Sequence, residues 1–329
     1  MTHPRLPSRP AMPPHPKAAG FTLVEAVLVI VIIGVLAGIV AVFIRAPILG
    51  YRDSVDRAEI TDQADLALRR IARDIRLALP NSVRVNGDGR ALEFLQTRSG
   101  ARYLSLDDGV DTALTLNFET AQLNFTAIAP LSSFGQVRAG DYVVVYNLGP
   151  GFEPADAYNL NESAREKNIA RITARADTTV VLPGQSATDP TPAVQITLAS
   201  NPFASQATPM TSPMQRFQVV SGPVSFYCER RTDGTLDLWR HWGYTIGATQ
   251  PLPAIAATPT SAATASTFPA GGTRALVASR LTRCDGIFNY STAASQRTGL
   301  VGIDLALRGR NEATQAIRLL HQVHVDNTP

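Results

Sequence analysis

Histidine side chains are a natural first place to look for catalysis or metal binding in this sequence. His321 and His324 lie three residues apart in an alternating apolar segment that we predict to be a strand. That separation places the two imidazoles on opposite faces of a strand, which is unsuitable for joint ligation of one metal. His241 stands alone beside Trp239 and Trp242, and we interpret it as a structural residue.

Acidic side chains gather in the segment "LDDGVD". Asp107, Asp108 and Asp111 surround Gly109 and could contribute to calcium binding, but they lack the alternating ligand series of an EF-hand loop. A solvated turn is the favoured interpretation. The sequence also has no phosphate-binding loop, nucleophile elbow or zinc-helix motif. We therefore predict a protein that is not an enzyme and has no cofactor or metal.

The sequence has two cysteines, Cys228 and Cys284. Two cysteines cannot form a closed zinc site by themselves, and the C-x-x-C spacing is absent. A single disulfide in an oxidising compartment is the favoured interpretation, and two buried reduced thiols are the alternative. Pairing would close a loop of 56 sequence steps and stabilise the fold by about 2–4 kcal/mol.

One carboxylate, Glu25, stands at the entrance of a long apolar run. The 19 residues from Ala26 to Ile44 carry no charge and as a helix would extend roughly 28 Å, close to the hydrocarbon thickness of a bilayer. An ionised carboxylate costs about 2.5–3.5 kcal/mol at the bilayer centre, less near the interface, and such acids tend to have a partner. Apart from the leader, this chain places no basic residue near Glu25. We expect the partner to come from another chain.

A secretory signal peptide and a plain signal anchor are two alternative interpretations of the apolar run. The run exceeds the apolar core of about 7–15 residues in a secretory signal peptide, and Arg45 and Pro47 follow it rather than a cleavage site. A plain signal anchor would have the same orientation, because basic residues precede the span. Both alternatives place the residues after about 45 outside the cytoplasm.

The segment "GFTLVE", followed by the apolar run, resembles the class III leader and N-terminal segment of type IV pilins and type II secretion pseudopilins. The resemblance implies that a prepilin peptidase cleaves after Gly20 and methylates the new N-terminal residue, Phe21. It also implies that Glu25 neutralises the terminal amine of a neighbouring subunit during assembly. The implied partners are the peptidase, other major and minor pilins, and an inner-membrane assembly platform.

Composition restricts the remaining function classes. The chain has 329 residues, 45% of them hydrophobic, which is enough for a sizeable core. Its net charge is +3, but three of the 30 basic side chains precede Gly20, which leaves 27 to balance 27 acidic ones. This balance argues against nucleic acid or an anionic lipid surface as an electrostatic partner of the folded part.

A second helical pattern follows the apolar run. Pro47 is expected to kink the helix, and Pro80 to end it at Leu79. If the helix is otherwise continuous, Phe21 to Leu79 would extend on the order of 90 Å. We expect its apolar stripe to pack against the chain's own head domain rather than form a coiled coil, since heptads are not sustained. The stripe consists of Val55, Ala64, Leu68, Ile71, Ile75 and Leu79.

The rest of the chain has the pattern of a β-rich domain. Asp233-Gly234 is a hairpin signal between two strands. We predict an α+β fold in which a long N-terminal helix, membrane-spanning in its first half, packs on a large, mainly antiparallel β head. The expected strands are 91–97, 113–119, 141–148, 178–183, 193–199, 216–231, 236–244, 298–309 and 318–329, with Cys284 in a further strand at 281–290; 183–213 and 247–273 are expected to be loop-rich.

The expected organisation is a leader at 1–20, a transmembrane and assembly helix at 21–46, an amphipathic continuation at 47–80 and a β-rich head at 81–329. The inferred location is the inner membrane, as a single-pass protein with its head in the periplasm. After assembly the subunit would lie in the pilus filament or at its tip.

Shorter matches indicate a finer grouping. "ALPNSVRV", the ending "LLHQVHVDNTP" and one cysteine in each of two late strands resemble O-type minor pilins of mannose-sensitive haemagglutinin (MSHA) pili. The resemblance implies a low-copy structural subunit that helps to initiate or cap a filament. Retention of Glu25 implies a place below another subunit, because the outermost subunit of some initiating complexes lacks this acid.

Two departures from this pattern are the proline-rich 20-residue leader and the Ala/Thr-rich loop. A J-like pseudopilin of type II secretion is the nearer alternative. A membrane-anchored binding module, whose β head recognises a surface or a sugar, is the main rival from another class. An exported enzyme on an anchor is the remote third.

Overall fold

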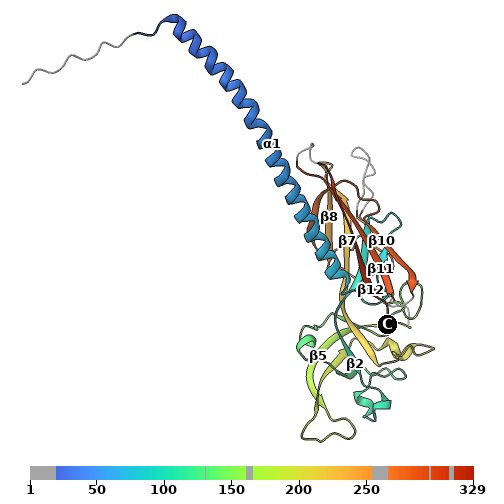
Figure 1. Cartoon of the computed structure of the whole chain (residues 1–329). Helices are drawn as coiled ribbons and strands as arrows, with labels where there is room; N and C mark the ends of the chain where they lie inside the picture. Colours follow the sequence, from blue (N-terminus) through green and yellow to red (C-terminus); the bar gives the residue numbers. More distant parts are fainter. Residues whose placement is uncertain (1–19, 130, 161–165, 254–265, 296–297, 311–314) are drawn as a thin grey trace, which may run out of the picture. The chain divides into compact units, whose positions relative to one another are not determined.

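The computed structural model describes residues 20–129, 131–160, 166–253, 266–295, 298–310 and 315–329 (Figure 1). The chain divides into two compact units, Met1–Val55 and Asp56–Pro329. The leader before Gly20 and much of the Ala/Thr-rich loop lie outside the described residues.

Helix α1 (Leu23–Ile75) runs through the boundary between the two units. In the first unit it is apolar and long enough to cross a membrane, and no described side chain of its apolar run is buried. Pro47 lies inside the helix. The kink expected there stays a prediction.

The part of α1 that belongs to the second unit has a different surface. Its buried side chains recur at intervals of three and four residues, as expected for a helix that packs one face on a sheet. They share a core with several strands, which confirms that this stripe packs on the head domain. Val55 is the exception, because its side chain is 48% exposed. The buried residues of this stripe are Ile60, Ala64, Ala67, Leu68, Ile71, Ala72 and Ile75.

The helix ends at Ile75, four residues before the predicted end at Leu79. Strand pairing ends it rather than Pro80. The Leu79 N–H donates to the Leu95 carbonyl at 2.8 Å, and the Thr97 N–H donates to the Leu77 carbonyl at 2.7 Å. These backbone groups are therefore used by a neighbouring strand instead of a further helical turn.

Twelve strands are described, and all of their pairings are antiparallel, so the predicted α+β class is confirmed. Short helices lie between some of them: η1 (Leu106–Asp108), η2 (Thr112–Leu114), α2 (Leu131–Phe134) and η3 (Pro202–Ser205). The strands are β1 (Arg84–Val85), β2 (Ala91–Tyr103), β3 (Asn124–Ile128), β4 (Tyr142–Val144), β5 (Ile169–Val180), β6 (Thr191–Leu198), β7 (Arg216–Arg230), β8 (Leu236–Trp242), β9 (Thr273–Leu281), β10 (Phe288–Ser295), β11 (Thr298–Leu307) and β12 (Ile317–Asp326).

The strands of the second unit form two lobes that share the long strands β2 and β7 (Figure 1). The helix lobe consists of α1 from Asp56, β1, β8–β12 and the adjoining halves of β2 and β7. The barrel lobe is the closed circuit of pairings β2–β3–β6–β5–β4–β7–β2. Its core contains Phe217, whose ring lies edge-on to those of Phe125 and Phe134, with ring centroids 5.5 and 6.0 Å apart, respectively.

Several strand predictions need correction. Residues 113–119 do not form a strand, because Asp111 caps η2 by accepting from the Ala113 N–H at 2.9 Å. Strands β1, β3 and β9 were not predicted, and β5 ends at Val180, so most of it precedes the predicted strand 178–183. Cys284 lies in the connection between β9 and β10 rather than in a strand. Strands β3 and β9 are short or weakly alternating segments whose pairing partners are distant in the sequence.

We predict that Ile71→Ala lowers the free energy of unfolding of the head by about 2–5 kcal/mol, because Ile71 is fully buried and its removal leaves a cavity. Leu66→Ala is the matched control on the same helix, since Leu66 is 68% exposed, and we expect a change within about 0.5 kcal/mol. Denaturant unfolding of the two variants in the full chain measures the difference. Equal effects would contradict the assignment of the buried face.

Candidate functional site

The N-terminal junction is open in the described part of the chain. Gly20 is exposed, and a Cβ added to it would meet no atom within 4 Å. The side chain of Phe21 is 77% exposed. No described residue therefore covers the peptide bond between them.

Thr22 begins the helix next to this junction. Its hydroxyl accepts from the Glu25 N–H at 3.3 Å, and its carbonyl accepts from the Ala26 N–H at 3.1 Å. Thr-x-x-Glu is the pattern of a capping box, and a carboxylate in the first turn also interacts favourably with the helix dipole. The Thr22 hydroxyl thus caps the start of α1 through the backbone of Glu25, whose carboxylate lies in the first turn. This cap was not predicted, although the Thr-x-x-Glu spacing is a sequence signal for it.

Among the described residues of the first unit, Glu25 has no cation within reach. The next basic residue of α1 is Arg45, 20 positions further on, or about 30 Å along a helix. The structure gives Glu25 no ion pair among the described residues of this unit. Its carboxylate is therefore available to a positive charge from another chain.

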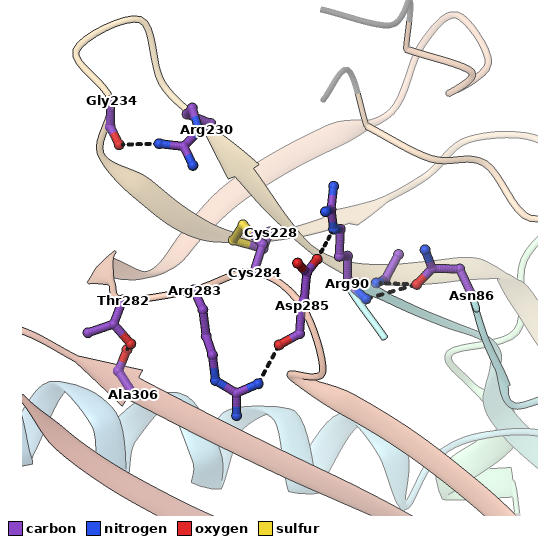
Figure 2. Close-up of a disulfide and its surroundings, with 11 residues drawn as sticks. Asn86, Arg90, Cys228, Arg230, Gly234, Thr282, Arg283, Cys284, Asp285 and Ala306 are labelled. Carbon is purple, nitrogen blue, oxygen red and sulfur yellow. Dashed lines mark hydrogen bonds and ion pairs between the residues drawn. A yellow bond between two sulfur atoms is a disulfide. The ribbon is translucent and has the colours of Figure 1, made fainter. Parts of the chain in front are cut away.

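The two cysteines form a disulfide, as predicted. Cys228 lies in β7 and Cys284 in the β9–β10 connection, with their Cα atoms 5.4 Å apart (Figure 2). Cys228 is buried in the core of the helix lobe. The disulfide therefore fixes a surface connection to a central strand.

Polar contacts around the disulfide add a third segment to it (Figure 2). The Cys228 N–H donates to the Arg90 carbonyl at 3.1 Å, and the Arg90 guanidinium pairs with Asp285. The Gly286 N–H donates to the Asp88 carbonyl at 2.9 Å. The turn before β2, strand β7 and the β9–β10 connection are thus held together at one place.

His241 is packed among aromatic side chains. The ring of His241 lies 4.6 Å from Phe268 and 4.9 Å from Tyr244, rather than against the two tryptophans beside it in sequence. Burial lowers the pKa of His241, which favours the neutral imidazole. In β12, His324 is exposed and His321 lies on the opposite face, as predicted.

The acidic turn is occupied by local contacts. The Asp108 carboxylate pairs with Arg102 and accepts from the Ser105 N–H at 2.9 Å, while Asp111 caps η2. Across the described ranges, no three or more His, Cys, Asp or Glu side chains are placed to hold a metal ion. The turn is therefore used for capping.

A buried polar cluster at Glu93 was not identified from the sequence. Arg84 contacts the Glu93 carboxylate at 2.8 Å, and the Tyr244 hydroxyl donates to it at 3.0 Å. Ser225 shares a hydrogen bond of 2.6 Å with Tyr244, and the Arg84 guanidinium lies 3.7 Å from the centre of the Tyr158 ring. Burial raises the pKa of Glu93, and Arg84 opposes this shift. The contacts satisfy both charges, so the cluster has a structural role. Its only signal in the sequence was a lone acid within the apolar strand "ALEFL".

Comparison with known protein families identifies the N-terminal segment. Residues 15–41 match the prokaryotic N-terminal methylation motif, and the match includes Gly20, Phe21 and Glu25. No curated protein and no solved structure matches the chain. The chain is therefore pilin-like in its N-terminal segment.

Proteins of the pilin type are structural, and the chain is accordingly a structural protein rather than an enzyme. The motif implies processing by a prepilin peptidase and assembly with pilins. Together with the apolar part of α1, it is consistent with anchoring in the inner membrane before assembly.

We predict that Cys228→Ser/Cys284→Ser lowers the free energy of unfolding of the head by about 2–4 kcal/mol, because the disulfide restricts the unfolded chain by joining two residues at a sequence separation of 56. Denaturant unfolding is the measurement. Reduction of the wild-type chain should lower its stability to that of the double variant. An unchanged midpoint under reductant would contradict a stabilising disulfide.

Proposed function

We propose that the chain is a low-copy minor pilin of an MSHA-type type IV pilus, which helps to initiate or cap the filament after processing by a prepilin peptidase. The observation that carries this proposal is the methylation motif at the start of a helix whose apolar run has no buried side chain. Such a surface requires either lipid or other apolar helices around it.

Burial along α1 supports assembly through its first part. From Ile60 to Ile75 the apolar stripe is already used by the head. Before Asp56 no described side chain of the helix is buried. Contacts with other subunits would therefore be made mainly by the segment that begins at Phe21.

Glu25 supplies a specific interaction within this apolar surface. The N-terminal amine of a neighbouring processed subunit would offer a matching positive charge. Opposite charges about 4 Å apart attract by roughly 4 kcal/mol at an effective dielectric of 20, before desolvation is subtracted. The pair would offset the cost of the buried carboxylate and set the axial position of one subunit on the next.

The assignment to MSHA-type minor pilins rests on the segments "ALPNSVRV" and "LLHQVHVDNTP". The part of the resemblance that places one cysteine in each of two late strands is weaker, because Cys284 lies in a connection rather than a strand. Retention of Glu25 supports a place below another subunit. Recovery of the protein from sheared pili of cells without a type II secretion system would support a pilus over the J-like pseudopilin alternative.

The membrane-anchored binding module is the second candidate. The capping contact between Thr22 and Glu25 is compatible with this candidate, because a simple tether also benefits from a well-started helix. The two functions differ in whether the leader must be removed and whether the charge of Glu25 is needed.

We predict that the membrane-extracted protein begins at N-methylated Phe21 when a prepilin peptidase is present, and retains its leader when the peptidase is absent. Intact mass and N-terminal sequencing distinguish the two forms. If cells that make only the uncleaved chain, with its leader still attached, behave as wild type, the filament proposal is refuted and the tether is supported.

We predict that Glu25→Gln reduces recovery of the subunit in sheared filaments at least about tenfold, because it removes the charge that would pair with a terminal amine. Glutamine can replace glutamate in a capping box, so the start of α1 should be preserved. Quantitative immunoblotting of the filament and membrane fractions is the measurement.

Two control variants separate charge from helix capping. Thr22→Ala removes the capping hydroxyl but retains the carboxylate, and Asp62→Asn removes an exposed carboxylate from the solvated part of the same helix. Both should enter filaments nearly as wild type. Equal loss in Thr22→Ala would indicate that assembly depends on the start of the helix rather than on the charge of Glu25.

A further inference from the structure

A pocket in the barrel lobe lies beside the start of β5. Its volume is about 460 Å³, within the range of small-molecule sites. Strands β4 and β5 supply one wall, and the segment from β6 into η3 supplies the other. The described lining residues that carry polar side chains are Tyr142, Lys167, Arg171, Ser200, Asn201 and Ser205.

Hydrogen bonds fix the backbone of both walls. The Ala199 N–H donates to the Arg171 carbonyl at 2.8 Å, and the Gln206 amide donates to the Lys167 carbonyl at 2.9 Å. The Asn201 amide donates to the carbonyls of Asn117 and Thr120 at 2.8 and 3.1 Å. The backbone of the pocket walls is therefore held in place by the lobe, and the side chains of Arg171, Ser200 and Ser205 are exposed on it.

The charge of the lining has one sign. Lys167 and Arg171 are its ionisable cations, and no carboxylate belongs to the described lining. The described structure gives neither cation a carboxylate partner. A negatively charged ligand would meet two positive charges here without repulsion from an acid in the lining.

Neutral polar groups accompany these cations. Ser200 and Ser205 present exposed hydroxyls, and Tyr142 adds a phenol. Leu160 and Pro202 supply apolar surface in the same lining. Hydroxyl groups both donate and accept hydrogen bonds, so they suit a ligand with hydroxyls of its own rather than a bare anion.

We propose that this pocket binds a small carboxylate that carries hydroxyl groups, of the sugar-acid class. Lys167 and Arg171 would contact the carboxylate, while the serine and tyrosine hydroxyls would contact the hydroxyls of the ligand. The proposal goes beyond the assembly function and does not depend on it, because every lining residue belongs to the second unit.

A property of the sequence provides a selective reporter. Lys167 is the only lysine after the leader. Reductive methylation with ¹³C-formaldehyde would label its amine while retaining the positive charge. The Lys167→Arg variant, which loses this signal, separates it in the NMR spectrum from labelled amines in the leader or at the N-terminus.

The test is a titration of the detergent-solubilised full chain with glucuronate, followed at the labelled Lys167 methyl groups. Glucose and sulfate are titrated in parallel. We expect saturable shifts with glucuronate and no saturable shift with glucose. Arg171→Gln should weaken glucuronate binding roughly tenfold, because it removes a charged hydrogen-bond donor.

Arg308→Gln is the matched control, since Arg308 is exposed and does not line the pocket; its affinity should equal that of the wild type. Absence of a saturable shift with glucuronate would overturn the proposal. An equally strong response to sulfate would also overturn it, because the pocket would then be a general anion site. Failure of either arm has no bearing on leader removal or filament assembly.

Discussion

The pairing of β2 with β7 is the interaction on which the rest of the head depends. The two strands pair from Ala91↔Tyr227 to Arg102↔Arg216, with two irregularities along the way. One end of the pair contributes to the sheet under α1, and the other closes the barrel lobe. Because both lobes use the same two strands, neither can form its complete core without this pairing. The disulfide also begins on β7, so a covalent constraint acts on the same element.

Helix α1 divides its surface between two kinds of contact. After Asp56 its apolar side chains are buried by the head, whereas the apolar side chains of its first part have no protein around them in the described structure. The hydrophobic effect stabilises the head, but in the first unit it leaves apolar side chains that are not buried. Lipid would cover these side chains in a membrane, and neighbouring helices would cover them in a filament. Under the proposed function, the carboxylate of Glu25 would make the second environment selective, because a chain that presents a positive charge would compensate it.

Buried charge is treated differently in the head. Glu93 is enclosed, but Arg84 and Tyr244 occupy its oxygens, so the acid has a complete set of internal partners. The pocket beside β5 shows the opposite arrangement, since Lys167 and Arg171 have no acidic partner in the described structure. The two sites also differ in burial, because Glu93 is fully buried whereas Arg171 is exposed. The difference lies in whether the chain itself supplies the counter-charge.

The sequence by itself determined the features that depend on local order: the uncharged run after Glu25, the helical stripe at Ala64, Leu68 and Ile71, and the alternating strands such as 216–231. It also indicated the disulfide, since only two cysteines were available to pair. Only the tertiary structure decided the end of α1 at Ile75, the place of Cys284, the barrel circuit and the Glu93 cluster. The place of Cys284 and the barrel circuit depend on contacts between segments far apart in the chain, whereas the end of α1 and the Arg84–Glu93 contact depend on how the chain turns back into β2. Neither kind of contact leaves a periodicity in the local sequence.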